Sequence, residues 1–158
     1  MSAAAFPAAA SAAAEVHPLV AQLLARTGAV ELSPSSAASF AEGRGMRVLV
    51  FLEDPARYRE TLDLAVIVPE LVALFTPRLA LGVLLPVAAR AVAPQYGVRR
   101  WPALVVLRDG AYMGAIEGLR AWEEYLQALA RLAIAAPSRV PVVGIALTRR
   151  GEGPAREV

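Results

Sequence analysis

The chain is organised around residues 96–118, YGVRRWPALVVLRDGAYMGAIEG. Residues 103–107 and 111–116 are mostly apolar, the first run is rich in branched aliphatic side chains, and an Arg-Asp-Gly sequence separates the two. This pattern predicts two antiparallel strands joined by a tight turn. Pro102 lacks a backbone N–H and restricts Trp101 to extended geometry. It therefore belongs at a strand start or in a special turn, including one with a cis peptide bond.

Upstream, two apolar runs predict the middle of a sheet. Residues 46–52, MRVLVFL, are nearly continuous in apolar side chains, as expected of a central strand covered on both faces. Residues 79–84 predict a second buried strand, parallel to the first through a helical crossover. Pro69 and Glu70 are expected to begin the crossover helix, because proline suits the first helical position and a carboxylate is stabilised near a helix N-terminus. Leu71, Leu74 and Phe75 would form its apolar face.

The remaining segments follow from helical spacing, capping residues and composition. We expect a helix over 18–27 with Gly28 as its C-cap, a strand over 29–32, a short helix through 40–42 and a helix over 86–93. A final helix over 120–136 would bury Trp122, Leu126, Leu129, Ala133 and Ala136. Residues 1–14 are alanine-rich and expected to be disordered, residues 15–136 form the predicted domain, and residues 137–158 are an extension with a polar tail.

Composition excludes several classes of function. The 158 residues carry a formal net charge of only +2, and the scattered arginines give no nucleic-acid footprint. Cysteine is absent, so disulfides, thiolate metal sites and dithiol redox chemistry are excluded. His17 is the only histidine, which makes a metal site unexpected, and no cofactor is predicted. The N-terminus is a poor export signal and no apolar run approaches the roughly 20 residues that span a bilayer, so a soluble cytoplasmic protein is the expectation.

Two blocks carry a resemblance to a known family. Residues 51–75, FLEDPARYRETLDLAVIVPELVALF, and residues 99–126, RRWPALVVLRDGAYMGAIEGLRAWEEYL, resemble the HupG/HyaE/HoxO family of hydrogenase expression proteins. These are thioredoxin-like accessory proteins of membrane-bound nickel-iron hydrogenases, and the resemblance covers roughly residues 29–135. It implies an α/β, thioredoxin-like fold, with a mixed central sheet, a C-terminal β-hairpin and flanking helices. Pro102 would take the place of the cis-proline of that fold.

The chain departs from thioredoxins where their chemistry lies. The resemblance places the dithiol loop within residues 55–60, PARYRE, which hold no cysteine. The buried acidic residue that assists thioredoxins would fall near Val50, which cannot carry a proton. Both departures indicate that the redox function is lost and that the protein is not an enzyme, while a scaffold able to present an extended peptide remains.

The candidate site is therefore a peptide-binding one. Backbone groups next to a cis-proline can pair with an extended peptide by strand addition. Trp101 and Pro102 would form an apolar platform with Tyr58 as a second aromatic contact, although Trp101 could equally be buried under the preceding helix. The loop that follows the central strand has five acids and two bases, which fits either a basic peptide bound through its arginines or an ordinary solvated loop. These residues are Glu53, Asp54, Glu60, Asp63 and Glu70, with Arg57 and Arg59.

The resemblance also implies a function. It predicts a non-catalytic chaperone that binds the precursor of the hydrogenase small subunit, including its twin-arginine signal peptide, and holds it from export until cofactor assembly is complete. The alternative is a scaffold module that binds another accessory protein through residues 140–147, VPVVGIAL, without recognising a signal peptide. A thiol oxidoreductase, the third hypothesis, conflicts with the absence of cysteine.

Overall fold

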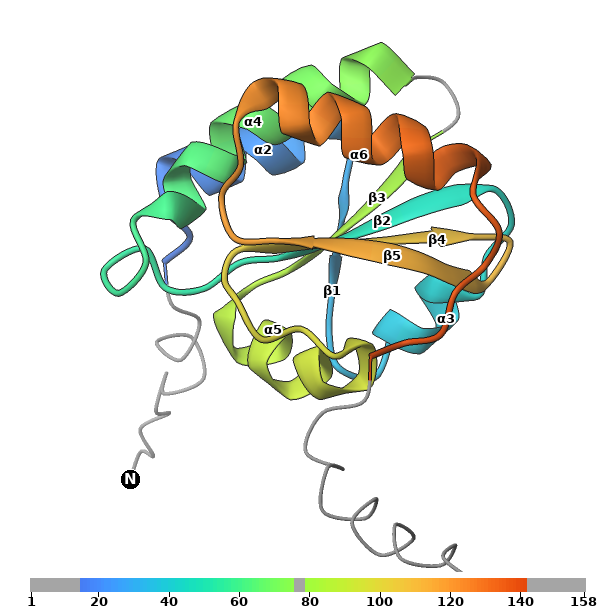
Figure 1. Ribbon diagram of the computed structural model, residues 1–158. Coiled ribbons are helices and arrows are strands. Elements are labelled where there is room, and N and C mark those ends of the chain that lie inside the picture. The colour runs from blue at the N-terminus through green and yellow to red at the C-terminus, as the bar shows by residue number, and fades with distance from the viewer. Residues whose placement is uncertain (1–14, 76–78, 142–158) are drawn as a thin grey trace, which may run out of the picture.

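A five-stranded mixed sheet forms the centre of the protein (Figure 1). The computed structural model describes residues 15–75 and 79–141. The strand order is β1-β3-β2-β4-β5, in which β1, β3 and β2 run parallel, β4 runs antiparallel to β2, and β5 runs antiparallel to β4. The strands are β1 (Val30–Leu32), β2 (Met46–Phe51), β3 (Leu79–Leu84), β4 (Ala103–Arg108) and β5 (Ala111–Glu117).

Helices cover both faces of the sheet, with α2, α4 and α6 on one face and α3 and α5 on the other (Figure 1). This arrangement is the thioredoxin-like α/β fold that the sequence predicts. The predicted central strand is confirmed, because β2 is the third of the five strands and pairs in parallel with β3. The helices are α2 (Pro18–Thr27), α3 (Ala37–Ala41), α4 (Glu60–Phe75), α5 (Pro86–Val92), the 3₁₀ turn η1 (Ala93–Tyr96) and α6 (Trp122–Ile134).

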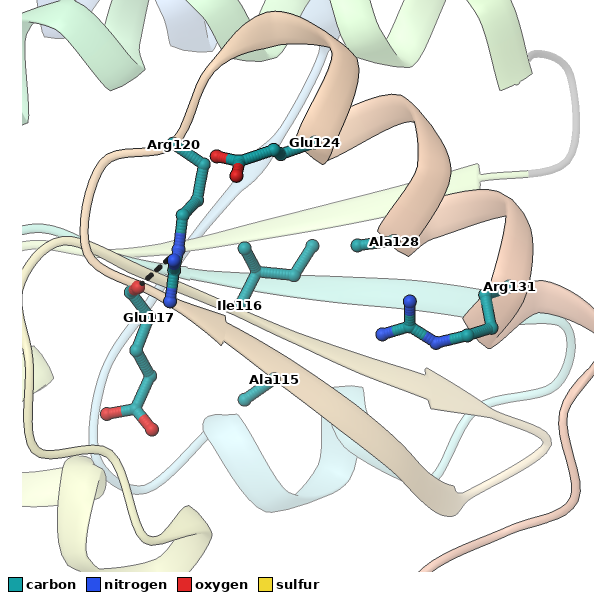
Figure 2. Close-up of a pocket in the computed structure, with 7 residues that line it drawn as sticks. All are labelled: Ala115, Ile116, Glu117, Arg120, Glu124, Ala128 and Arg131. Atoms are coloured by element: carbon teal, nitrogen blue, oxygen red, sulfur yellow. Dashed lines mark hydrogen bonds between the residues drawn. The ribbon is translucent and has the colours of Figure 1, made fainter.

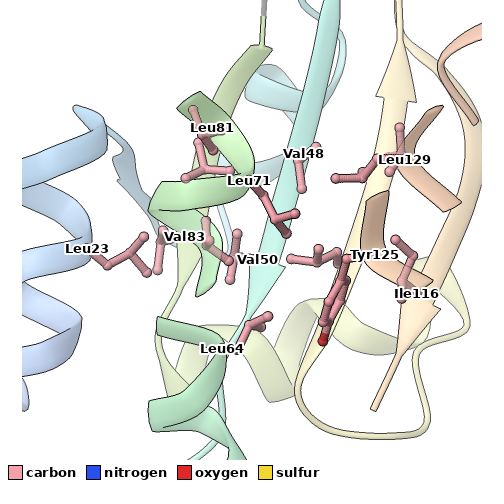
Figure 3. Packing of buried hydrophobic residues seen from close by; sticks show 14 of the residues in the cluster. Leu23, Val48, Val50, Leu64, Leu71, Leu81, Val83, Ile116, Tyr125 and Leu129 are labelled. Atoms are coloured by element: carbon pink, nitrogen blue, oxygen red, sulfur yellow. The ribbon is translucent and has the colours of Figure 1, made fainter. Parts of the chain in front are cut away.

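Alternation along β2 divides the core into two layers. Val48 and Val50 pack under the face that carries α2, α4 and α6, in the cluster shown in Figure 3. Leu49 and Phe51 pack on the opposite face with residues of α3 and α5. Successive side chains of a strand point to opposite faces, so a run without polar residues is what a strand buried on both sides requires.

The crossover helix begins earlier than the sequence predicts. We expected Pro69 near its first turn, whereas α4 begins at Glu60 and Pro69 lies buried inside it. A turn nucleated by Asp54 leads into the helix, since the Asp54 carbonyl accepts the N–H groups of Arg57 and Tyr58, each at 2.9 Å. An interior proline removes one helical hydrogen bond. The helix continues through it because the residues on both sides bury an unbroken apolar face: Leu64, Ala65, Val68, Leu71 and Val72.

The last helix is also shifted from its prediction. It ends at Ile134, and its buried residues are Tyr125, Leu129 and Leu132. Of the predicted core residues only Leu129 is fully buried; Trp122, Leu126 and Ala133 are half-buried, and Ala136 is exposed beyond the helix end. The buried stripe is therefore displaced around the helix, which the shared apolar spacing could not reveal.

The hairpin predicted within residues 96–118 is confirmed. Asp109 and Gly110 join β4 to β5 with φ angles of 50° and 84°, as a two-residue turn with positive φ requires. A bulge between Val106 and Leu107 interrupts the pairing. Residues 137–141 contain no helix or strand, and the predictions for residues 1–14 and for most of 137–158 lie outside the described residues. Among the described helices, none has the length and apolar character to cross a bilayer.

Candidate functional site

Trp101 and Pro102 lie at the start of β4, beside the end of β2. The peptide bond between them is cis, in agreement with the sequence prediction. The register pairs Phe51 with Ala103, so this bond lies immediately beyond the last pair of the β2–β4 ladder. Pro102 is buried, and its carbonyl accepts the Gly118 N–H at 2.8 Å. The Pro102 carbonyl is thus bound by the residue that follows β5.

The Trp101 ring is half-buried and rests on the core. Its centroid lies 6.4 Å from that of Phe51, and the Phe51 ring in turn lies 6.3 Å from that of Tyr96. Phe51 is completely buried, so these contacts hold the indole in a defined position on the α5 side of the sheet. Trp101 is therefore neither fully buried nor fully exposed, and it contacts the core through Phe51.

The backbone of Trp101 is available for pairing. Within the described part of the chain, neither its N–H nor its C=O has a hydrogen-bonding partner. A backbone donor and acceptor that are not paired within the protein are satisfied by water or by another chain. An extended peptide could satisfy both by adding a strand next to Trp101.

The loop of residues 55–60, where the resemblance places the dithiol of thioredoxins, is closed by local hydrogen bonds. The Asp54 carboxylate accepts the Ala56 N–H at 2.9 Å, which closes a side-chain turn of the kind that aspartate favours. Tyr58 is 37% exposed, and its carbonyl accepts the Thr61 N–H at 3.0 Å as α4 begins. Val50, at the place of the thioredoxin acid, is completely buried in the apolar core. The loop is therefore held by its own hydrogen bonds, with one aromatic side chain left in contact with solvent.

The predicted acidic residues do not all lie together. Glu60 and Asp63 are exposed in the first turn of α4, close in sequence to half-buried Asp54. Glu70 lies ten residues further along the same helix, about 15 Å from Glu60 at a rise of about 1.5 Å per residue. Its carboxylate accepts a hydrogen bond from Arg26 of α2 at 3.1 Å. Three of the five predicted acids thus lie at or just before the start of α4, and Glu70 belongs to the contact between α2 and α4.

Glu53 has a role that the sequence does not indicate. It is only 4% exposed, and its carboxylate accepts two hydrogen bonds from Arg90 of α5, Nε to Oε2 at 2.8 Å and Nη2 to Oε1 at 2.5 Å. The Asp54 N–H donates a third at 2.7 Å. The Arg90 guanidinium is the main cause that holds the pKa of Glu53 below its ordinary value, against the opposing effect of burial. The expectation that Glu53 adds to a solvated acidic face is therefore wrong.

This ion pair joins the candidate site to α5. Glu53 lies two residues beyond the end of β2, at the end of the ladder where Phe51 pairs with Ala103, and its partner Arg90 is 44% exposed. A charged residue so soon after a buried strand indicated that Glu53 could be a functional or paired residue. Its partner lies 37 residues away, however, and no local pattern identifies it. In the described part of the chain no group of three or more acidic, histidine or cysteine side chains could hold a metal ion.

Comparisons with known proteins agree on one family. A sequence model of the family described as "Hydrogenase-1 expression protein HyaE" matches residues 19–125. The hydrogenase expression/formation protein HoxO of Cupriavidus necator is 34% identical over 144 residues, which is 87% of each chain. HoxO of Azotobacter vinelandii is 35% identical over 112 residues, 71% of this chain and 75% of the relative. HupG of Bradyrhizobium diazoefficiens is 33% identical over 91 residues, 58% of this chain and 62% of the relative.

Proposed function

This chain belongs to the HyaE family of hydrogenase expression proteins, and we propose that it serves hydrogenase maturation as a non-catalytic, thioredoxin-like chaperone. The names of its relatives support a role in hydrogenase formation. The absence of cysteine excludes thiol exchange by the chain itself. Binding, rather than chemistry on the bound protein, is the function proposed.

The proposed ligand is the precursor of a hydrogenase small subunit, bound in the cytoplasm through its twin-arginine signal peptide before export. The observation that carries this proposal is the backbone of Trp101, whose N–H and C=O are unpaired within the described residues while the indole is held against Phe51. An extended peptide would pair with these groups and lay an apolar side chain on the Trp101–Pro102 platform.

Charge supports the basic character of that peptide. Asp54, Glu60 and Asp63 are close in sequence, where the loop after β2 leads into α4. Carboxylates bind guanidinium groups through bidentate hydrogen bonds, so adjacent arginines of a signal peptide would find acceptors there. Tyr58, on the same loop, offers a further aromatic surface. Glu70 contributes less than these three under this proposal, because it already pairs with Arg26.

The test is binding of the small-subunit precursor, with and without its signal peptide, to the purified protein. We expect the signal peptide to contribute most of the affinity. We expect the double substitution Glu60→Arg and Asp63→Arg to weaken binding by about tenfold or more, since it replaces attraction by repulsion. Glu123→Arg, an equally exposed acid on α6, is the matched control and should leave binding unchanged.

Trp101→Ala tests the platform separately. It should lower the affinity while circular dichroism reports an unchanged fold. Binding that does not depend on the signal peptide, or that survives both the charge reversals and Trp101→Ala, would contradict the proposed site. If instead removal of residues 142–158 alone abolishes association with a maturation protein, the scaffold function replaces the one proposed here.

A further inference from the structure

The outer edge of β5 carries unpaired backbone groups. The hydrogen bond from the Gly118 N–H to the Pro102 carbonyl, 2.8 Å, sets which residues of the hairpin pair with β4. In an antiparallel ladder, residues that hydrogen-bond to the neighbouring strand alternate with residues that do not. Gly118 bonds to Pro102, so Ala115 and Glu117 belong to the second kind, and their N–H and C=O groups point away from β4, toward the edge. The Glu117 carbonyl accepts Arg120 Nε at 3.1 Å. Ala115 has no such partner within the described residues.

Within the described residues, the segment after α6 covers one end of this edge. After α6, the Ser138 N–H donates to the Tyr112 carbonyl at 2.9 Å, and the Ser138 hydroxyl donates to the Met113 carbonyl at 3.4 Å. Among the described residues, this segment protects the start of β5 and Arg120 protects the Glu117 carbonyl, which leaves the edge around Ala115 open. Native proteins usually protect edge strands, so an open portion beside a protected one calls for an occupant.

The open portion lies beneath a hollow along α6 (Figure 2). Ala115 and Ala128 present only methyl groups to it, and Ile116 forms its apolar floor. In Figure 2 the Arg131 guanidinium extends over one end of the hollow, and the Glu124 carboxylate lies at the other end, beside Arg120. A second strand that approaches β5 here meets one large side chain at the edge, Arg120, which would have to release the Glu117 carbonyl.

The charges along α6 suit a second copy of the same helix in the opposite direction. Glu123 and Glu124 stand in its first turn and Arg131 in its last, with no ion pair to another described residue. Glu124 and Arg131 are seven residues apart, about two helical turns, so both lie on the same face. A two-fold axis near Ala128 brings Glu124 of each copy beside Arg131 of the other.

We propose that two copies of this chain associate through β5 and α6, pairing their β5 edges antiparallel about Ala115 to form one continuous sheet. The two Ala115 residues exchange N–H···O=C bonds at the centre. On the α6 face, Ile116 of each copy lies against Gly114 of the other, which has no side chain to obstruct it. Two antiparallel α6 helices pack at about 8–10 Å, a distance that the small Ala128 side chain permits.

The decisive experiment uses Glu124→Arg and Arg131→Glu, each in the full chain, studied by sedimentation velocity over about 1–100 μM, where a dimer of moderate affinity dissociates. We expect the unaltered chain to dimerise and each variant alone to associate about tenfold or more weakly, because like charges meet across the axis. An equimolar mixture of the two variants should form a heterodimer, since both cross-axis pairs are then attractive. Glu124→Arg also removes the hydrogen bond that the Ala121 N–H donates to the Glu124 carboxylate. If that loss alone weakened association, mixing the two variants would not restore it.

Amide hydrogen exchange supplies an independent readout. The Ala115 N–H should become protected as the protein concentration rises, and the Val30 N–H on the opposite, β1 edge of the sheet serves as the comparison. A monomer at every concentration overturns the proposal. So does a dimer that both charge substitutions leave intact, or exchange at Ala115 that does not vary with concentration.

Discussion

Replacing Glu53 by glutamine should destabilise the fold at neutral pH in a way that disappears in acid. In the native protein the carboxylate has two acceptor oxygens for three donated hydrogen bonds, two from Arg90 and one from the Asp54 N–H. Glutamine keeps the shape but has one acceptor oxygen, and its amide N–H groups would face donors. At least one hydrogen bond to a 4% exposed group is therefore lost.

The magnitude follows from these contacts. A hydrogen bond to a charged group contributes about 1.5–3 kcal/mol. Arg90 is 44% exposed, so water can replace part of the interaction, and the expected loss lies toward the low end, about 1.5–2 kcal/mol in the free energy of unfolding. Urea unfolding followed by the fluorescence of Trp101 and Trp122 measures it, as a shift in midpoint at constant slope.

The pH dependence gives the sharper result. The folded pKa of Glu53 is lowered, so its contribution is fully present above the unfolded pKa of about 4.3 and is lost as the pH falls through the folded pKa. Below that point the native side chain is a neutral acid, and the two proteins should differ little. A difference under about 0.5 kcal/mol at pH 7, or one that is the same in acid, would refute the assignment of a stabilising buried pair.

Two further substitutions test how the hairpin holds α6. Arg108→Gln should lower the free energy of unfolding by about 1–2 kcal/mol, because the Arg108 guanidinium donates to the carbonyls of Ala133 and Ala135 at the end of α6, at 2.7 and 2.9 Å. Faster hydrogen exchange confined to that helical turn would confirm this role, and Arg44→Gln is the control. Gly114→Ala should lower the free energy of unfolding by about 1–3 kcal/mol, since the new Cβ would lie 2.7 Å from Leu132 Cδ2 at a φ of 155°. In thermal unfolding, Gly114→Ala should destabilise the protein less when Leu132→Ala is also present. Strictly additive effects of the two substitutions would contradict the contact.

Local patterns were sufficient for most of the fold. The hairpin follows from two apolar runs around Asp109 and Gly110, and β2 follows from an apolar run too continuous for an exposed strand. Pro102 could be placed because proline cannot donate to a ladder. The start of α4 was misplaced, because Pro69 is a strong helix-start signal and nothing in its neighbourhood shows that the face it buries extends back to Leu64.

The sequence by itself determined the order of the strands' apolar runs, the loss of dithiol chemistry and the place of Trp101 and Pro102. Tertiary structure alone decided which charges meet: Glu53 with Arg90, and Glu70 with Arg26, are separated by 37 and 44 residues. The spacing of neighbouring residues indicates which side chains are buried and which segments pair as strands, so both can be predicted from local sequence. The partner of a charge depends on how distant elements pack, and that packing exists only in the folded chain.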